Sequence, residues 1–227
     1  MFIHEMFQQK PCVFSVEVFP PKKAGAAEET LYPVLRELCT LGPDYISVTY
    51  GAGGGTAGQS TAKIASYIKN GLHVEALAHL TCVNSTRVQV EETLTRLRED
   101  NVENVLALRG DINPDLPRRM DFLHASDLAK AIAQTGGFGV AGACYPEGHV
   151  ESPSLKADVE SLRYKAEAGV SHLITQLFFD NVSYYRFLNM ARKAGISLPV
   201  QAGIMPIVSK RQIERSAPPA CRRSLLK

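Results

Sequence analysis

The sequence lacks the features that mark membrane, secreted and nucleic-acid-binding proteins. No run approaches the roughly 20 apolar residues of a membrane-spanning helix, and residues 1–12 lack the apolar stretch of a signal peptide. The formal net charge of +2 is spread along the chain without a basic stripe. These absences predict a protein with no nucleic-acid partner and no membrane partner.

Cysteine is scarce, and several catalytic motifs are missing. The five cysteines are dispersed, odd in number and free of any C-x-x-C pair, which favours reduced thiols and a cytoplasmic location. No H-x-x-x-H or Cys/His cluster has the spacing of zinc ligands, so no metal is expected. The absence of a G-x-S-x-G elbow and of a P-loop argues against a serine nucleophile and against nucleotide hydrolysis.

What the sequence does contain is a regular alternation of two patterns. The 227 residues are 45% hydrophobic, enough for one substantial core. Apolar residues at helical spacing occur at 31–38, 90–97, 155–166 and 184–191. Ser85 or Thr86 is a candidate N-cap for the helix at 90–97, and Gly169 and Gly195 follow the ends of the helices at 155–166 and 184–191. Short apolar runs lie at 12–19, 44–51, 75–82, 104–111, 138–146, 172–180 and 199–206.

This alternation predicts an α/β fold with parallel strands and crossover helices. "GAGGGT" at 51–56 is only a weak match to a dinucleotide-binding turn, and a (β/α)8 TIM barrel fits better. Such a barrel needs an eighth strand, and residues 215–227 contain two prolines and no strand pattern. We therefore expect residues 1–212 to form a barrel lacking its eighth strand–helix unit, followed by a divergent tail at 213–227.

A glutamate interrupts the first apolar run. Alternation along "FSVEVF" places Phe14, Val16 and Val18 on one face, toward the helices, and Ser15 and Glu17 on the other, inside the barrel. A carboxylate removed from water costs several kcal/mol unless something offsets it. A salt bridge to Arg109 is one structural explanation, and a functional role is the other.

Polar residues also follow the later runs, at the strand ends where barrel active sites gather. Packing alone accounts for some of them: His79 could bond a backbone carbonyl in the core, Asp111 could cap the next segment, and Asp180 has the place of a helix N-cap. The polar residues near the ends of the second to sixth runs are Thr49, Tyr50, His79, Arg109, Gly110, Asp111, Tyr145, Glu147, His149, Gln176 and Asp180. The pattern predicts a soluble barrel enzyme, without naming its substrate.

Seven motifs in order resemble the 5,10-methylenetetrahydrofolate reductase family: "FSVEVFPPK", "DYISVTYGAGG", "AHLTCVNST", "NVLALRGD", "ASDL", "CYPEGH" and "HLITQLFFD". The resemblance covers about residues 10–212. It implies a (β/α)8 barrel that binds FAD and uses NADH or NADPH to reduce 5,10-methylenetetrahydrofolate to 5-methyltetrahydrofolate, the methyl source for methionine. It also implies a homo-oligomer, and the chain resembles the short bacterial form.

The resemblance assigns roles to particular residues. Glu17 matches the general acid that protonates the folate, for which a buried setting and a raised pKa would be suitable. Asp111, Gln176 and Gln212 match substrate-binding residues. The positions that hold FAD in the family match Thr49, Tyr50, Ala52, His79, Arg109, Gly110, Asp111, His124, Ala125, Tyr145, His149, Asp158 and Lys165.

The resemblance fades after Gln212. Ser216 stands where the family has an aromatic residue, and the eighth strand and a late folate-binding arginine have no counterpart. From this we expect weakened flavin retention, poor solubility and low or absent activity, and a non-catalytic flavin- or folate-binding remnant is the alternative function. An unrelated barrel aldolase would need a Schiff-base lysine inside a strand, and none of the seven runs has one.

Overall fold

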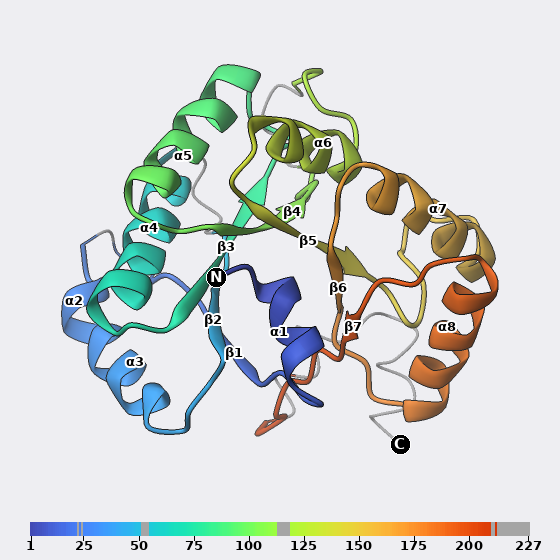
Figure 1. The fold of residues 1–227 in the computed structure, drawn as a ribbon, viewed down its shortest axis with the longest axis horizontal. Helices are drawn as coiled ribbons and strands as arrows, with labels where there is room; N and C mark the ends of the chain where they lie inside the picture. Colours follow the sequence, from blue (N-terminus) through green and yellow to red (C-terminus); the bar gives the residue numbers. More distant parts are fainter. Residues whose placement is uncertain (22, 24, 51–54, 113–118, 210–211, 213–227) are drawn as a thin grey trace.

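A curled parallel sheet forms the centre of the protein (Figure 1). The computed structural model describes residues 1–21, 23, 25–50, 55–112, 119–209 and 212. Seven strands follow one another in sequence order, and within these residues no eighth strand–helix unit follows, so the predicted parallel α/β arrangement is confirmed as a partial barrel. The strands are β1 (Ser15–Val18), β2 (Tyr45–Val48), β3 (Glu75–Thr81), β4 (Asn104–Leu108), β5 (Gly139–Cys144), β6 (His172–Thr175) and β7 (Val200–Gln201).

Helices cover the outside of the curl (Figure 1). Side chains of Thr86, Ser154 and Asp180 cap three of them by accepting a bond from a first-turn amide, as predicted for Thr86 and Asp180. Gly169 and Gly195 follow two helix ends at φ +98° and +81°, where glycine is favoured. The elements are α2 (Ala27–Thr30), α3 (Tyr32–Cys39), α4 (Gly55–Ser66), a π-helical turn η1 (Tyr67–Gly71), α5 (Arg87–Glu99), α6 (Ala125–Thr135), α7 (Leu155–Glu167) and α8 (Asn181–Lys193).

Strand alternation divides the core into two parts. On β2, Ile46 and Val48 point outward into the large cluster shared with the helices, while Tyr45 belongs to a smaller cluster inside the curl. Leu77 of β3 and Leu106 of β4 join that inner cluster. The inner face therefore has an apolar cluster of its own, and polar side chains also lie on it, both beside α1 and toward the carboxyl ends of the strands.

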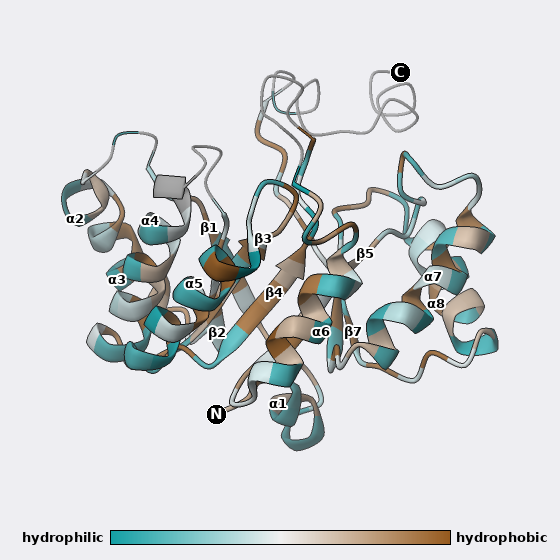
Figure 2. Cartoon of the chain, turned by 90° about the horizontal axis from the view of Figure 1, so that it is seen from above, coloured by the Kyte–Doolittle hydropathy of each residue, from teal (hydrophilic) through white to brown (hydrophobic). Residues whose placement is uncertain are grey.

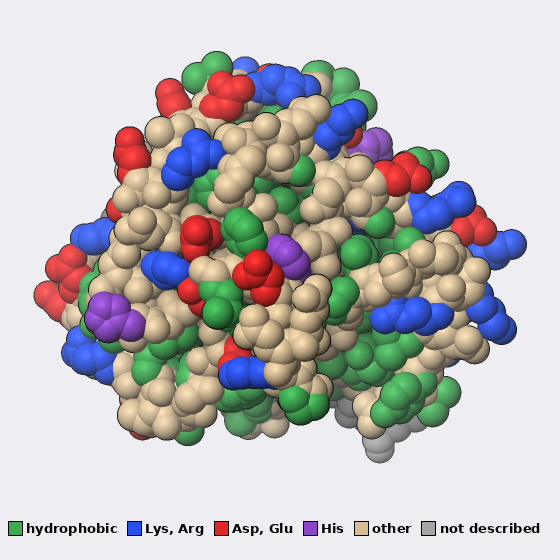
Figure 3. Space-filling view, viewed as in Figure 1, with side chains coloured by type: hydrophobic (Ala, Val, Ile, Leu, Met, Phe, Trp, Pro, Cys, Tyr) green, Lys and Arg blue, Asp and Glu red, His purple; other side chains and the backbone are tan. Residues whose placement is uncertain are grey.

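A short helix that the sequence reading did not anticipate, α1 (Ile3–Gln9), closes the amino end of the curl. The Ile3 amide donates to Oδ1 of Asn104, the first residue of β4, at 2.9 Å. The Phe7 ring lies 5.4 Å from the ring of His172, the first residue of β6. Figure 2 shows α1 at one end of the sheet, and Figure 3 shows side chains filling the centre of the ring on that face. Ligands must therefore enter from the opposite, carboxyl end.

The last strand is shorter than the predicted run at 199–206. Only Val200–Gln201 pairs with β6. Beyond it the Gly203 amide donates to the Thr175 hydroxyl, at 2.9 Å, and does not continue the backbone ladder. On β1, Val18 faces the helices as expected, but Phe14 is 46% exposed. In the described ranges no helix is long and apolar enough to cross a membrane.

Candidate active site

A cavity of about 1670 Å³ opens at the carboxyl ends of the strands, opposite α1. Ala52, one of the predicted site residues, lies outside the described residues. Gln212 does not line the cavity: its side chain bonds the Val208 amide and the Pro206 carbonyl, each at 3.0 Å. The other predicted residues all line the cavity, namely Glu17, Thr49, Tyr50, His79, Arg109, Gly110, Asp111, His124, Ala125, Tyr145, His149, Asp158, Lys165 and Gln176.

Glu17 lies on the inner face of the curl, as strand alternation predicts. Its neighbour in register on β2 is Ser47, whose Oγ lies 2.6 Å from Nε2 of His79. Glu17 Oε2 lies 3.5 Å from the same nitrogen, and the Glu17 side chain is 48% exposed, toward the cavity. The alternative of a Glu17–Arg109 salt bridge is wrong, because Arg109 pairs with Glu151.

The surroundings of the Glu17 carboxyl favour its protonated form. Burial raises the pKa of Glu17, and the hydrogen bond from Ser47 offsets part of that rise. Burial lowers the pKa of His79 to about 4, so the ring is neutral at pH 7 and its contact with Glu17 is not an ion pair. His79 is a buried histidine as one reading proposed, but its partner is the Ser47 hydroxyl and not a backbone carbonyl.

The turn after β4 supplies a cation. Arg109 holds Glu151 through two bonds, at 2.5 and 2.8 Å, and its Nε donates to the Gly110 carbonyl at 3.2 Å. Glu151 raises the pKa of Arg109 further. Gly110 has φ +86°, and a Cβ there would lie 3.0 Å from the Thr81 Cβ, so both conformation and space require glycine.

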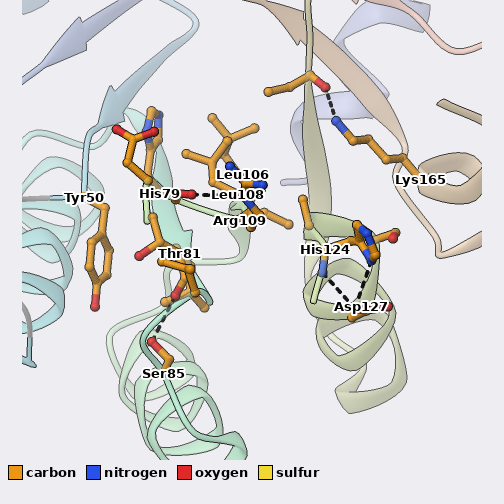
Figure 4. A pocket seen from close by; sticks show the side chains of 18 of the residues that line it. Tyr50, His79, Thr81, Ser85, Leu106, Leu108, Arg109, His124, Asp127 and Lys165 are labelled. Atoms are coloured by element: carbon orange, nitrogen blue, oxygen red, sulfur yellow. Dashed lines mark hydrogen bonds and ion pairs between the residues drawn. The ribbon is translucent and has the colours of Figure 1, made fainter. Parts of the chain in front are cut away.

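A second cation reaches in from α7 (Figure 4). Lys165 Nζ donates to the Ala143 carbonyl at 2.5 Å and lies 5.9 Å from the Tyr145 ring centroid. Burial lowers the pKa of Lys165. Asp158, two turns earlier on the helix, accepts a bond from the His149 amide at 3.1 Å, and burial raises its pKa.

The rest of the wall is polar and partly aromatic. The Tyr50 hydroxyl hydrogen-bonds Thr81, and burial raises the pKa of Tyr50. The His124 side chain, at the start of α6, is 72% exposed. Asp111 and Gln176 are exposed at the rim. The described residues contain no cluster of three or more His, Cys, Asp or Glu side chains that could hold a metal.

Sequence reasoning missed many polar residues of the cavity and its floor, among them Ser47, Thr81 and Glu151. Ser47 and Thr81 each interrupt an apolar strand on the inward face, and that alternation could have revealed them. Glu151 sits in an irregular loop, and only the fold brings it to Arg109.

The fold and cavity define a parallel α/β protein with a large cavity at the carboxyl edge of its sheet. The model of the family "Methylenetetrahydrofolate reductase" matches residues 2–220, and the chain belongs to this family of oxidoreductases. It is 37% identical over 203 residues to the 5,10-methylenetetrahydrofolate reductase of Pectobacterium carotovorum subsp. carotovorum, covering 89% of this chain and 67% of that protein. With the enzyme of the same name from Escherichia coli (strain K12), identity is 35% at the same coverage.

A plant relative is longer. Methylenetetrahydrofolate reductase (NADH) 1 of Arabidopsis thaliana is 35% identical over 230 residues, covering 95% of this chain but 38% of the plant protein. Among solved structures, oxaloacetate acetylhydrolase aligns with TM-score 0.60 and 12% identity over 93% of this chain and 75% of its own. A 2,3-dimethylmalate lyase aligns with TM-score 0.60 and 11% identity over 95% and 76%. At such low identity these two structures show a shared fold and nothing about chemistry.

Proposed function

We propose that this chain reduces 5,10-methylenetetrahydrofolate to 5-methyltetrahydrofolate, with FAD as cofactor and NADH or NADPH as electron donor. The observation that carries the proposal is one cavity that gathers Glu17, Asp111, Gln176 and the described FAD-binding candidates in a member of this family. The proposed partner is thus a small folate, and the product supplies the methyl group for methionine.

The cavity has room for a large ligand. Pockets for drug-sized molecules occupy about 300–1,000 Å³, and this one, at about 1670 Å³, can take a dinucleotide together with a folate. Its inner wall includes Leu106 and Leu108, which offer apolar surface to a flat ring system.

The cations of the cavity suit a pyrophosphate. Lys165 donates to one carbonyl, and in the described part of the chain no carboxylate lies within 4 Å of its Nζ, so it keeps two N–H donors for an anion. Arg109 uses three of its five N–H groups on Glu151 and Gly110 and keeps two. Of the two, Lys165 is the better candidate, since a buried ammonium gains most from a nearby anion.

Bound FAD would supply hydride to the one-carbon group. The residues of the chain hold the substrate and its proton: Asp111 and Gln176 at the rim would bind the folate, and Glu17 would donate a proton to the bridged folate nitrogen. Protonation opens the ring of the substrate to an iminium, which is the form that accepts hydride. The raised pKa of Glu17 supports this role, because a general acid must be protonated near the working pH.

The alternative is a non-catalytic remnant that binds flavin or folate. The observation that favours it is the open seam: in the residues that the structure describes, β1 pairs only with β2 and β7 only with β6, short of a closed (β/α)8 barrel. A Schiff-base aldolase remains disfavoured, because the lysines of the described chain that line the cavity, Lys130 and Lys165, lie on helices and not inside a strand.

Half-reactions separate the two functions. The purified chain, incubated with FAD and freed of excess, is first read for flavin absorbance. NADH or NADPH is then added anaerobically to bleach the flavin, and 5,10-methylenetetrahydrofolate to restore it. Retention, bleaching and restoration support the reductase. Retention without restoration supports the remnant. A colourless protein refutes the reductase and a flavin-binding remnant, and equilibrium binding of folate then tests the folate-binding form. We further propose a homo-oligomer in the cytoplasm, which size measurement and cell fractionation would test.

A further inference from the structure

A single side chain links the two edges of the open sheet. Gln201, on β7, donates through Nε2 to the Ser15 hydroxyl at 3.0 Å and to the Val13 carbonyl at 3.3 Å, both next to or on β1. Its Oε1 accepts from the Tyr45 hydroxyl on β2. Sheet pairing gives β1 and β7 no common ladder among the described residues, so these bonds bridge the seam where backbone pairing ends.

The amide is suited to this place because it is both donor and acceptor. Val13 offers a carbonyl, which only accepts, so Nε2 must face β1 and Oε1 must face Tyr45. Tyr45 is 1% exposed, so its hydroxyl needs a partner inside the protein. An apolar side chain of the same length could satisfy none of these groups.

The bridge lies one step below the proposed proton donor. Ser15 is paired with Tyr45, and two residues further along the same inward face Glu17 is paired with Ser47. Gln201 therefore fixes Ser15 and Tyr45, and the group of Glu17, Ser47 and His79 packs next to these residues on the same inner face. A strand that forms only two residues of ladder, as β7 does, contributes little restraint of its own.

We propose that Gln201 is a positioning residue that latches β7 to β1 and thereby fixes Glu17 beside Ser47 and His79. The importance for catalysis rests on the proposed function, whereas the latch itself does not. Loosening it lets β1 move away from β7, admits water through the seam to the Glu17 carboxyl and disturbs the contact with Ser47.

The test is a titration of Glu17 in the purified chain without cofactor. The side-chain carboxyl is followed by ¹³C NMR in wild type and in Gln201→Met, with Glu17→Gln to assign the signal. We expect the pKa of Glu17 to fall toward its ordinary value in Gln201→Met and amide exchange in β1 to accelerate at least tenfold. Ile132→Val, a change in the fully buried α6 core away from the seam, controls for general loss of stability and leaves the titration unchanged.

Smaller variants guard against a failure to fold. Ser15→Ala and Tyr45→Phe each remove one bond of the latch, and each shifts the titration in the same direction by less. Adding Ser15→Ala to Gln201→Met gives little further shift, because that bond is already lost. If the Glu17 titration is the same in wild type, Gln201→Met and both smaller variants, the latch is refuted. A shifted titration in a chain whose wild type does not reduce folate keeps the latch and refutes the proposed function.

If wild type is active, kinetics give an independent measure. Gln201→Met slows reoxidation of the flavin by 5,10-methylenetetrahydrofolate at least tenfold and changes its pH profile, while bleaching by NADH stays within about twofold. Equal slowing of both half-reactions means a general structural defect and overturns the positioning role.

Discussion

Glu17 acquires its properties from neighbours on two other strands. Ser47 stands beside it in register, and His79 reaches the same point from β3. Strand alternation was sufficient to predict that Glu17 points inward. The identity of its partners was not predictable from β1, because parallel register and the stagger between strands decide which residues meet.

Replacing the Glu17 carboxyl by an amide tests its role directly. In Glu17→Gln we expect the reduction of 5,10-methylenetetrahydrofolate to slow by about 10²–10⁴-fold, the usual contribution of a general acid. Bleaching of the flavin by NADH should be nearly unaffected. In wild type the folate rate should fall as the pH rises past the elevated pKa of Glu17, since the acid form is the active one; the variant should lose this dependence. A variant as fast as wild type would contradict the assignment.

His172 makes a residue-level contribution to acid sensitivity. It is 1% exposed beneath α1, and neither ring nitrogen has a hydrogen-bond partner among the described residues. Burial, with the nearby His4, lowers its pKa from 6.5 to about 4. Between pH 6.5 and pH 4, His172 binds a proton in the unfolded chain but stays neutral in the folded chain. The free energy of unfolding therefore falls as the pH falls from about 6.5 to about 4.

Replacing His172 should make the free energy of unfolding depend less on pH between about 6.5 and 4. His172→Leu is expected to recover up to about 3 kcal/mol of the loss between pH 6.5 and 4, the equivalent of the pKa shift. His79, with its own low pKa, keeps the remaining slope. Urea unfolding at a series of pH values, each curve referred to its value at pH 7.5, measures the difference. Parallel curves for the two proteins would rule out the effect.

At the scale of elements, the ends of the helices could be predicted from the sequence, whereas the packing of the helices could not. Caps at Thr86 and Asp180 and stops at Gly169 and Gly195 follow from local hydrogen bonding and backbone conformation, which need no tertiary contact. The short helix α1 escaped prediction because its buried residues, Ile3 and Met6, are too few to form a stripe. It is stable only where the amino end of the curl accepts it.

The N-cap of α8 provides a measurable element-level effect. The Asp180 carboxylate accepts from the Val182 amide at 2.9 Å and from the Ser183 hydroxyl at 3.2 Å. Asp180→Ala should cost about 1 kcal/mol in the free energy of unfolding. Asp180→Asn keeps an acceptor at the same place and should cost only a few tenths. Urea denaturation compares the three proteins; equal losses in Ala and Asn would show that charge, and not capping, stabilises the helix.

At the scale of the whole molecule, ligand and fold should stabilise each other. A ligand that binds only the folded chain adds about 2.7 kcal/mol at a hundredfold excess over its Kd. For a protein of this size that corresponds to a rise in Tm of roughly 5–10 °C. Differential scanning fluorimetry with increasing FAD should show this rise in wild type, and its absence would argue against a flavin site.

Two lysines on the same helix give the matched comparison. Lys165 lines the cavity, whereas Lys156 is exposed and pairs with Glu160 at 4.0 Å. Lys165→Met should weaken FAD binding at least tenfold and reduce the Tm rise, while its binding of riboflavin, which has no phosphate, should change little. Lys156→Met should behave as wild type with both ligands. Equal loss of FAD and riboflavin binding in Lys165→Met would mean a collapsed cavity and not a lost phosphate contact.

The sequence by itself determined the alternation of strands and helices, the inward face of β1 and the list of polar residues at strand ends, because these depend on periodicity and short-range bonding. Only the tertiary structure decided that Arg109 pairs with Glu151, that His79 meets Ser47 and Glu17, and that Gln201 spans from β7 to β1. Those contacts join residues from 32 to 186 positions apart. The curvature and stagger of the curled sheet bring such residues together, and no local pattern in the chain encodes that geometry.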